Sequence, residues 1–180
     1  QINAMYPKLT KENMHRPTWV GISMIYILTG ATRINAAIPT ADSVTPNAGG
    51  SSSKTASTQL FSAVFSDLDG AADLGFVNFL MNDSLNSANA CFVIYEPASN
   101  SLYLFDDPGT HIIGNISVGA GKLRNRQCAL DGGASSISAV GNSLTLKVSL
   151  SFYQTFNRLR NVYMLSFDKG GLSSGWQTRG

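Results

Sequence analysis

Apolar and polar residues alternate with a period of two along much of the chain, which is the pattern of β-strands with one buried face. Leu144, Leu146, Val148, Leu150 and Phe152 occupy five alternate positions, and polar residues separate them. Residues 59–66 alternate in the same way. Residues 76–81 are instead almost continuously apolar. The pattern predicts two half-buried strands and one strand that is covered on both faces.

Shorter runs of β-branched, aromatic and aliphatic residues predict the remaining strands, and turn residues separate these runs. The expected segments are 21–29, 41–46, 91–95, 102–105, 112–118, 123–130, 136–140 and 161–167. Turns are expected at 67–70, 96–101, 131–133, 141–142 and 170–171. No stretch of ten residues between them has helical periodicity. An all-β antiparallel sandwich is therefore expected, because each one-sided sheet must bury its apolar face against another.

The chain divides by composition into an N-terminal extension, residues 1–40, and the predicted sandwich, residues 41–180. Residues 19–31 of the extension carry no charge. They are too few to cross a bilayer as a helix, which needs about 20 apolar residues, so no membrane span is predicted. Three interpretations stay open: a strand over Gly21–Thr29, a secretory leader that is cut after residue 36, and the remnant of a purification tag.

Composition and charge exclude several classes of protein. Charged residues make up only 13% of the 180 residues and the net charge is +2, while 17 glycines and many Ser and Asn residues are present. A coiled coil, a strongly basic nucleic-acid-binding protein and an acidic tail are excluded, so no nucleic-acid partner is expected. The only two cysteines, Cys91 and Cys128, are either buried thiols or one disulfide. The even count and the polar, weakly charged composition favour a disulfide and an extracellular location, secreted or on the cell surface.

Acidic residues gather in two predicted loops. Asp67, Asp69 and Asp73 lie in one, and Asp106 and Asp107 lie in the other. If the loops meet at one pole of the sandwich, their oxygens suit Ca²⁺, which takes six to eight hard ligands. The more common role of Asp and Gly at such positions is turn formation. Calcium is the one cofactor that the sequence suggests.

Other surface features have a structural and a functional interpretation. Lys122, Arg124 and Arg126 alternate, which suits either a docking stripe for an anionic glycan or partner, or the protection of an edge strand. Trp19 and Trp176 suit sugar stacking, although aromatic residues in a sandwich usually belong to its core.

Catalytic motifs are weak. Gly171–Gly175 satisfies G-x-S-x-G, but no histidine or acid follows it, and Ser51–Lys54 matches S-x-x-K in a Ser/Gly loop. The chain has two histidines, His15 and His111, and nothing in the sequence recommends either as a catalytic base. We expect no enzyme activity.

The chain from residue 42 onward resembles an immunoglobulin-like or fibronectin type III-like module of large secreted bacterial proteins. The resemblance rests on eight segments: Ser43–Pro46, Phe65–Gly70, Asn89–Cys91, Ser101–Leu104, Gln127–Cys128, Gly141–Leu146, Asn161–Met164 and Gly171–Gln177. The resemblance implies an immunoglobulin-like sandwich, secretion, a Cys91–Cys128 disulfide and a structural or adhesive role, with no catalysis. Such modules run a few residues beyond the tryptophan, so a closing strand is expected to be missing here.

A missing strand and an apolar extension suggest assembly. Six residues of the segment 21–29 form a potential donor strand: Ile22, Met24, Ile25, Tyr26, Ile27 and Leu28. If this segment pairs with the edge strand of the next copy, a head-to-tail filament such as a pilus results. If it folds back, the protein is a monomeric binding or spacer module, dependent on glycan or calcium. Other copies of the chain are the partner that we expect first.

Overall fold

The computed structural model describes residues 36–47, 57–156 and 158–180. The predicted donor strand, Trp19, His15 and the Ser51–Lys54 motif lie outside the described residues.

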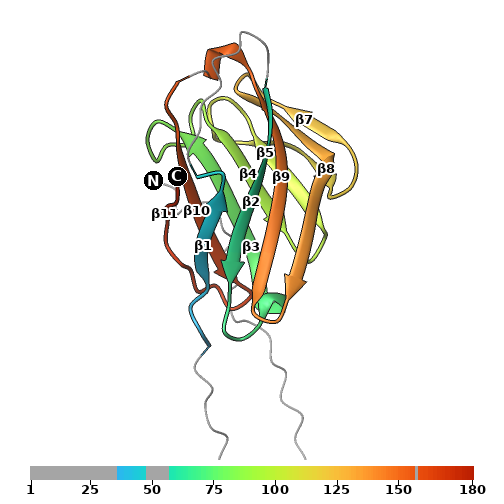
Figure 1. Ribbon diagram of the computed structural model, residues 1–180, viewed down its shortest axis with the longest axis vertical. Helices are drawn as coiled ribbons and strands as arrows, with labels where there is room; N and C mark the ends of the chain where they lie inside the picture. The colour runs from blue at the N-terminus through green and yellow to red at the C-terminus, as the bar shows by residue number, and fades with distance from the viewer. Residues whose placement is uncertain (1–35, 48–56, 157) are drawn as a thin grey trace, which may run out of the picture. The chain divides into compact units, whose positions relative to one another are not determined.

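The described residues form eleven strands and two single-turn 3₁₀ helices (Figure 1). The strands are β1 Thr40–Thr45, β2 Ser57–Ser66, β3 Leu74–Asn82, β4 Cys91–Glu96, β5 Ser101–Phe105, β6 Ile112–Ser117, β7 Lys122–Arg124, β8 Cys128–Val140, β9 Ser143–Phe152, β10 Asn161–Asp168 and β11 Gln177–Thr178. The helices are η1 Ala71–Asp73 and η2 Gln154–Phe156.

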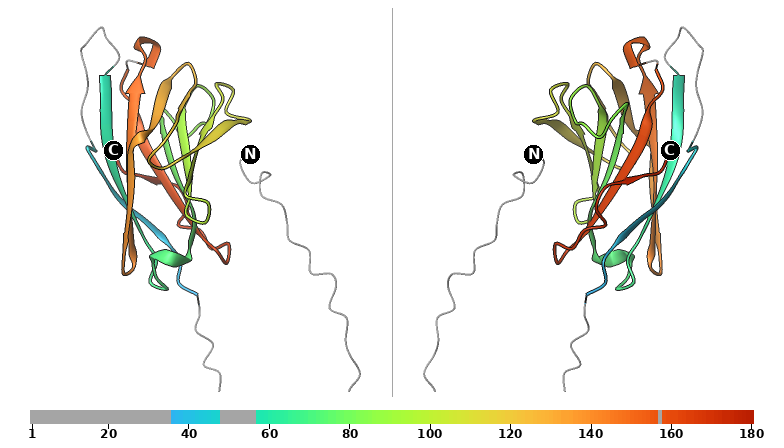
Figure 2. Two further views of the ribbon diagram at one scale, coloured as in Figure 1. Left: turned by 90° about the vertical axis from the view of Figure 1, so that its right-hand side faces the viewer. Right: turned by 90° about the vertical axis from the view of Figure 1, so that its left-hand side faces the viewer.

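The strands form two antiparallel sheets that face each other as two layers (Figure 2). Sheet A has five strands in the order β1-β2-β9-β8-β7, and sheet B has six in the order β11-β10-β3-β4-β5-β6. The chain crosses from sheet A to sheet B through residues 67–73, between β2 and β3. The predicted all-β antiparallel sandwich is confirmed, whereas the immunoglobulin-like resemblance remains a prediction.

The main core lies between the sheets and comes from the alternation in the sequence. In β9, Leu146, Val148 and Leu150 are completely buried and belong to this core, while Lys147 is exposed. Phe65 of β2 and Phe79 of β3 are also fully buried. Each such side chain contributes about 1.5–3 kcal/mol by leaving water, so the core is the main source of the sandwich's stability.

Sheet B is apolar on its outer face as well. In β3, Phe79 belongs to the core between the sheets, whereas Leu80, next in the chain, belongs to a second buried cluster. Within this second cluster Phe92 stacks on Phe105, with ring centroids 4.4 Å apart, and Trp176 packs edge-on against Phe92. The prediction that residues 76–81 are covered on both faces is therefore confirmed for the apolar residues of β3.

Residues 131–133 were expected to form a tight turn, and this expectation is wrong. β8 runs through them, with a shift of register between Asp131 and Ser136. A side chain at Gly132 would place its Cβ 2.2 Å from the carbonyl oxygen of Ala120, so the glycine permits close approach of two backbones. The Oγ of Ser135 donates to the carbonyl oxygen of Asp131 and accepts from the N–H of Ser149, which holds the irregular segment onto β9.

A short strand follows Trp176 at the β10 edge of sheet B. β11 pairs with β10, and the N–H of Val162 donates to the carbonyl oxygen of Gly180. Farther along, the N–H of Ser174 donates to the carbonyl oxygen of Ser166. The last residues of the chain therefore cover the outer edge of β10, because the turn after β10 brings them back alongside it.

Candidate functional site

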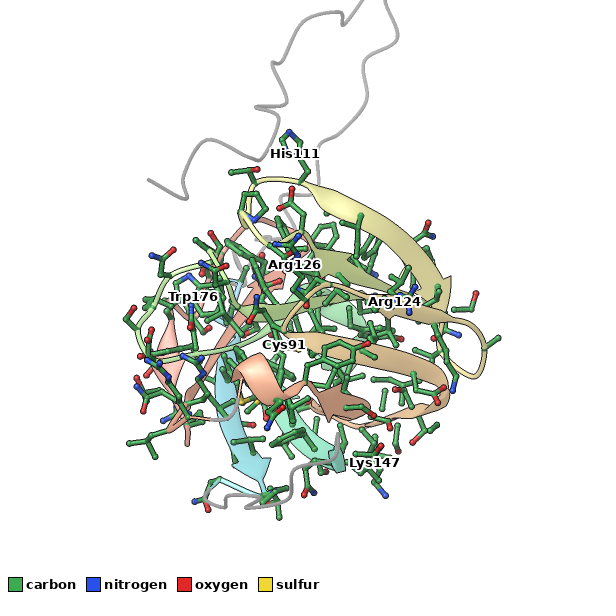
Figure 3. All side chains as sticks on the ribbon, turned by 90° about the horizontal axis from the view of Figure 1, so that it is seen from above. Cys91, His111, Arg124, Arg126, Lys147 and Trp176 are labelled. Carbon is green, nitrogen blue, oxygen red and sulfur yellow. A yellow bond between two sulfur atoms is a disulfide. The ribbon has the colours of Figure 1, made fainter. Side chains whose placement is uncertain are left out.

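The disulfide joins the two sheets near one end of the sandwich. Cys91 begins β4 in sheet B and Cys128 begins β8 in sheet A, and their sulfur atoms are 1.99 Å apart. Both residues are fully buried. Cys91 is labelled in Figure 3, which looks onto the sandwich from above. The predicted Cys91–Cys128 disulfide is confirmed, and it covalently fixes one layer to the other.

Asn125 supports the disulfide and was not identified from the sequence. Its Nδ2 donates to the carbonyl oxygens of Ala90, at 3.0 Å, and Phe105, at 3.1 Å. Its Oδ1 accepts from the N–H groups of Gln127 and Cys128. One amide side chain thus connects the residues beside both cysteines, and no motif in the sequence distinguishes it from the other asparagines.

The structure does not bring the two predicted acidic sets together. Asp67, Asp69 and Asp73 precede the first residue of β3, whereas the carbonyl oxygen of Asp107 accepts from the N–H of Asn89, beyond the last residue of β3. Because β3, β4 and β5 alternate in direction, the sets lie at opposite ends of the sandwich. The expectation that all five aspartates meet at one end of the sandwich is therefore wrong.

Asp106 and Asp107 stabilise loops by hydrogen bonds to the protein itself. Asp106 Oδ1 accepts from the N–H groups of Thr110 and His111. Desolvation acts to raise the pKa of Asp106, but these bonds and the His111 ring lower it overall. Asp107 Oδ1 accepts from the N–H of Arg126 at 2.8 Å. Turn and loop chemistry accounts for both residues.

The other acidic set forms a compact group, which we call the Asp loop (residues 67–73). One carboxylate oxygen from each of Asp67, Asp69 and Asp73 lies within 4.8 Å of the others. The N–H of Asp69 donates to Asp67 Oδ1 at 2.9 Å, and the N–H of Gly70 donates to the carbonyl oxygen of Asp67. Helix η1 then places Asp73 one turn farther on, so local turn geometry brings the three carboxylates together.

Within the Asp loop, Asp67 is the unusual residue. It is only 1% exposed, and its Oδ2 is buried without a hydrogen-bond partner. Burial raises the pKa of Asp67; the N–H of Asp69 opposes this, and the charges of Asp73, Asp69 and Asp168 add to it. A buried carboxylate oxygen without a partner is costly unless something else binds it.

Asp168, at the end of β10, lies beside this loop. It pairs with Leu74, the residue after Asp73, and the N–H of Lys169 donates to the carbonyl oxygen of Asp73. Asp168 is 4% exposed; its Oδ1 accepts from the N–H of Leu172, and its Oδ2 has no partner. Asp168 was not grouped with the Asp loop from the sequence, because 95 positions separate it from Asp73 and only the β3–β10 pairing brings them together.

The basic stripe is shorter than expected. Lys122 and Arg124 are exposed on β7, the last strand of sheet A, while Arg126 lies beyond that strand. Lys122 Nζ is 2.9 Å from Asp131 Oδ2. Their place on an edge strand favours edge protection over docking. Trp176 is half-buried and packs on Phe92 of the second cluster.

His111 does not have the geometry of a catalytic triad. Its side chain is 82% exposed and lies on the end of the sandwich that faces the viewer in Figure 3. Both Thr110 Oγ1, at 2.9 Å, and Asp106 Oδ2, at 3.3 Å, contact the same ring nitrogen, Nδ1. A triad needs the nucleophile on one ring nitrogen and the acid on the other. The contacts of His111 instead stabilise the loop between β5 and β6.

No protein family model, curated protein or solved structure matches the chain. Among the described residues, no helix has the length and apolar character needed to cross a membrane.

Proposed function

We propose that the chain is a non-catalytic structural or adhesive module of a secreted or cell-surface protein, with the described sandwich as a self-contained unit. The observation that carries this proposal is the covalent and non-covalent closure of the two layers. The disulfide crosses from sheet to sheet, and residues 172–180 cover the edge of β10.

The closure of the β10 edge of sheet B supports a monomeric spacer over a strand acceptor at that edge. On one side, Arg179 Nε donates to the carbonyl oxygen of Ala41 at 2.7 Å, which joins the C-terminal edge of sheet B to β1 of sheet A. On the other side, β6 and β7 are the last strands of their sheets. A module closed in this way holds its shape without a strand from another chain.

The disulfide and the surface chemistry support an extracellular location. Disulfides persist in oxidising compartments and are rare in the cytosol. Low charge and abundant Ser, Asn and Gly fit the same setting. In the part of the chain that the structure describes, the single histidine is engaged in a loop contact, which agrees with a structural role.

Light scattering coupled to size-exclusion chromatography tests the proposal on the full chain. We expect the measured mass to be that of one chain over a wide range of protein concentration. We also expect the sandwich to resist protease while its disulfide is intact. High-mass species that form without other proteins would contradict the monomeric module.

A filament subunit is the second candidate function, and the exposed edge of sheet B favours it. β6 is the last strand of that sheet, and Ile112 and Ile113 are 47% and 43% exposed. An edge strand of this kind accepts an added strand, and the segment Gly21–Thr29 has the composition to supply one.

Two variants separate the candidates. Replacing Ile25 and Ile27 by Asp removes the apolar character of the potential donor strand. A filament subunit loses its high-mass species in this variant and in Ile113→Asp. The control, Leu159→Asp, changes an apolar residue that is 89% exposed elsewhere on the surface, and it leaves a filament intact. A monomeric module shows one mass in all four proteins.

A further inference from the structure

The Asp loop joins the two sheets at the end of the sandwich opposite the disulfide. In Figure 1 it lies at the lower end, beside the turn between β8 and β9. Asp67, Asp69 and Asp73 each direct one oxygen into a space small enough that all three oxygens lie within 4.8 Å of one another. Three like charges at this separation repel one another, and the repulsion grows as the site is buried.

Within the described residues, no Lys, Arg or His forms an ion pair with these three carboxylates. The four ion pairs found there involve Asp106, Asp131, Asp107 and Asp83. The negative charge of the Asp loop is therefore not balanced by a cationic side chain of the described residues.

Two carboxylate oxygens at this end are buried without a hydrogen-bond partner. They are Oδ2 of Asp67, a residue that is 1% exposed, and Oδ2 of Asp168, a residue that is 4% exposed. Turn chemistry explains Asp67 Oδ1, which accepts from the N–H of Asp69, but it leaves Oδ2 without a role. Such an oxygen points to a bound cation, because a cation compensates both its desolvation and the repulsion from its neighbours.

We propose that Asp67, Asp69 and Asp73 bind one Ca²⁺ ion. Calcium takes oxygen ligands at about 2.3–2.6 Å, so two ligands on opposite sides of the ion lie about 4.8 Å apart. The three oxygens meet this limit. Magnesium binds at about 2.0–2.1 Å and retains several waters, which suits a buried ligand such as Asp67 less well. Water would supply the remaining ligands.

The ion would fasten several segments at this end of the sandwich. The N–H of Ala37, just before β1, donates to Asp69 Oδ2 at 2.6 Å. The N–H of Asp67 donates to the carbonyl oxygen of Asn142 in the β8–β9 turn, and the carbonyl oxygen of Asp73 accepts from the N–H of Lys169 after β10. Calcium would thus make rigid the end of the sandwich at which β1 begins. This property goes beyond the proposed structural role and does not depend on it.

Thermal unfolding of the full chain tests the site. After dialysis against EDTA, about 10 mM CaCl₂ raises Tm by about 5–10 °C if Kd lies near the 10⁻⁴–10⁻³ M typical of extracellular modules. Equal MgCl₂ gives a clearly smaller shift. Isothermal titration with CaCl₂ gives one site per chain.

Matched variants locate the site. Asp67→Asn keeps the size of the side chain and removes its charge, and it loses most of the calcium-dependent shift. Asp73→Asn, at a half-buried position, serves if the first variant does not fold. Asp107→Asn, at the other end of the sandwich, retains the full shift. The proposal is overturned by an unchanged wild-type Tm in calcium, by an equal shift in magnesium, or by a full shift in either Asp loop variant.

Discussion

Removal of the Cys91–Cys128 disulfide has a predictable effect on the free energy of unfolding. The bond closes a loop with a sequence separation of 37. In the loop-entropy model the crosslink lowers the conformational entropy of the unfolded chain by about 13 cal/mol/K. This stabilises the folded state by about 4 kcal/mol at 25 °C. Domains of this kind are stable by only about 5–15 kcal/mol, so the loss is a large fraction of the total. The double variant Cys91→Ala/Cys128→Ala removes the disulfide.

Urea unfolding measures this loss directly. The double variant is expected to unfold at a lower urea midpoint, with Tm lower by about 10–15 °C. Wild type that is fully reduced during unfolding is the matched control and should approach the variant's stability. The m-value should rise in both, because the unfolded chain without the crosslink exposes more surface. A difference below about 1 kcal/mol would refute the view that the crosslink between the sheets is a principal stabilising element.

Three further predictions concern side chains outside the disulfide. Asn125→Asp replaces two part-buried N–H donors by an acceptor that faces the backbone carbonyls, and urea unfolding should show a loss of about 2–4 kcal/mol; a loss below about 0.5 kcal/mol would contradict this. Arg160→Lys keeps the charge but loses the guanidinium that lies 4.3 Å from the ring centroid of Phe156, and should cost about 1–2 kcal/mol by the same assay; unchanged stability would show that the stacking is immaterial. Tyr103→Phe removes a hydrogen bond to Glu96 that, after that of Ser99, lowers the Glu96 pKa below 4.5. Because the folded-state pKa is depressed, this stabilisation is present above pH 4.5 and disappears as pH falls through the lowered pKa. The wild-type advantage in Tm over Tyr103→Phe should therefore shrink at acidic pH, and a pH-independent advantage would argue against the linkage.

The sequence predicted the fold class well because alternation reports burial directly. In β9, four of the five alternate apolar positions, Leu144, Leu146, Val148 and Leu150, are buried, and Phe152 is half-buried. The turn expected at residues 131–133 failed for a physical reason. Gly132 is needed there because its backbone lies close to that of Ala120. The sequence alone does not distinguish a glycine within a strand from a glycine within a turn.

The candidate sites were predictable only where local sequence assembles them. The Asp loop is local, since turn geometry and η1 bring Asp67, Asp69 and Asp73 together. The surroundings of the Asp loop were not predictable from the sequence. Asp168 lies beside the loop only because β3 pairs with β10, and the alternating strand directions place Asp106 and Asp107 at the other end of the sandwich. Asn125 was missed because its role depends on carbonyl groups 35 and 20 positions away.

Hydrogen exchange of the full chain in its monomeric fraction tests most directly whether the sandwich closes on itself. If the sandwich closes on itself, amides of β3, β4 and β10, including the buried Leu80, Val93 and Met164, exchange only through global unfolding. The amides of Val162 and Ser166, which donate to the C-terminal segment, are also protected. Rapid exchange along β10 in the monomer, with protection that returns only on self-association, would contradict it and indicate a sandwich completed by a strand from another copy.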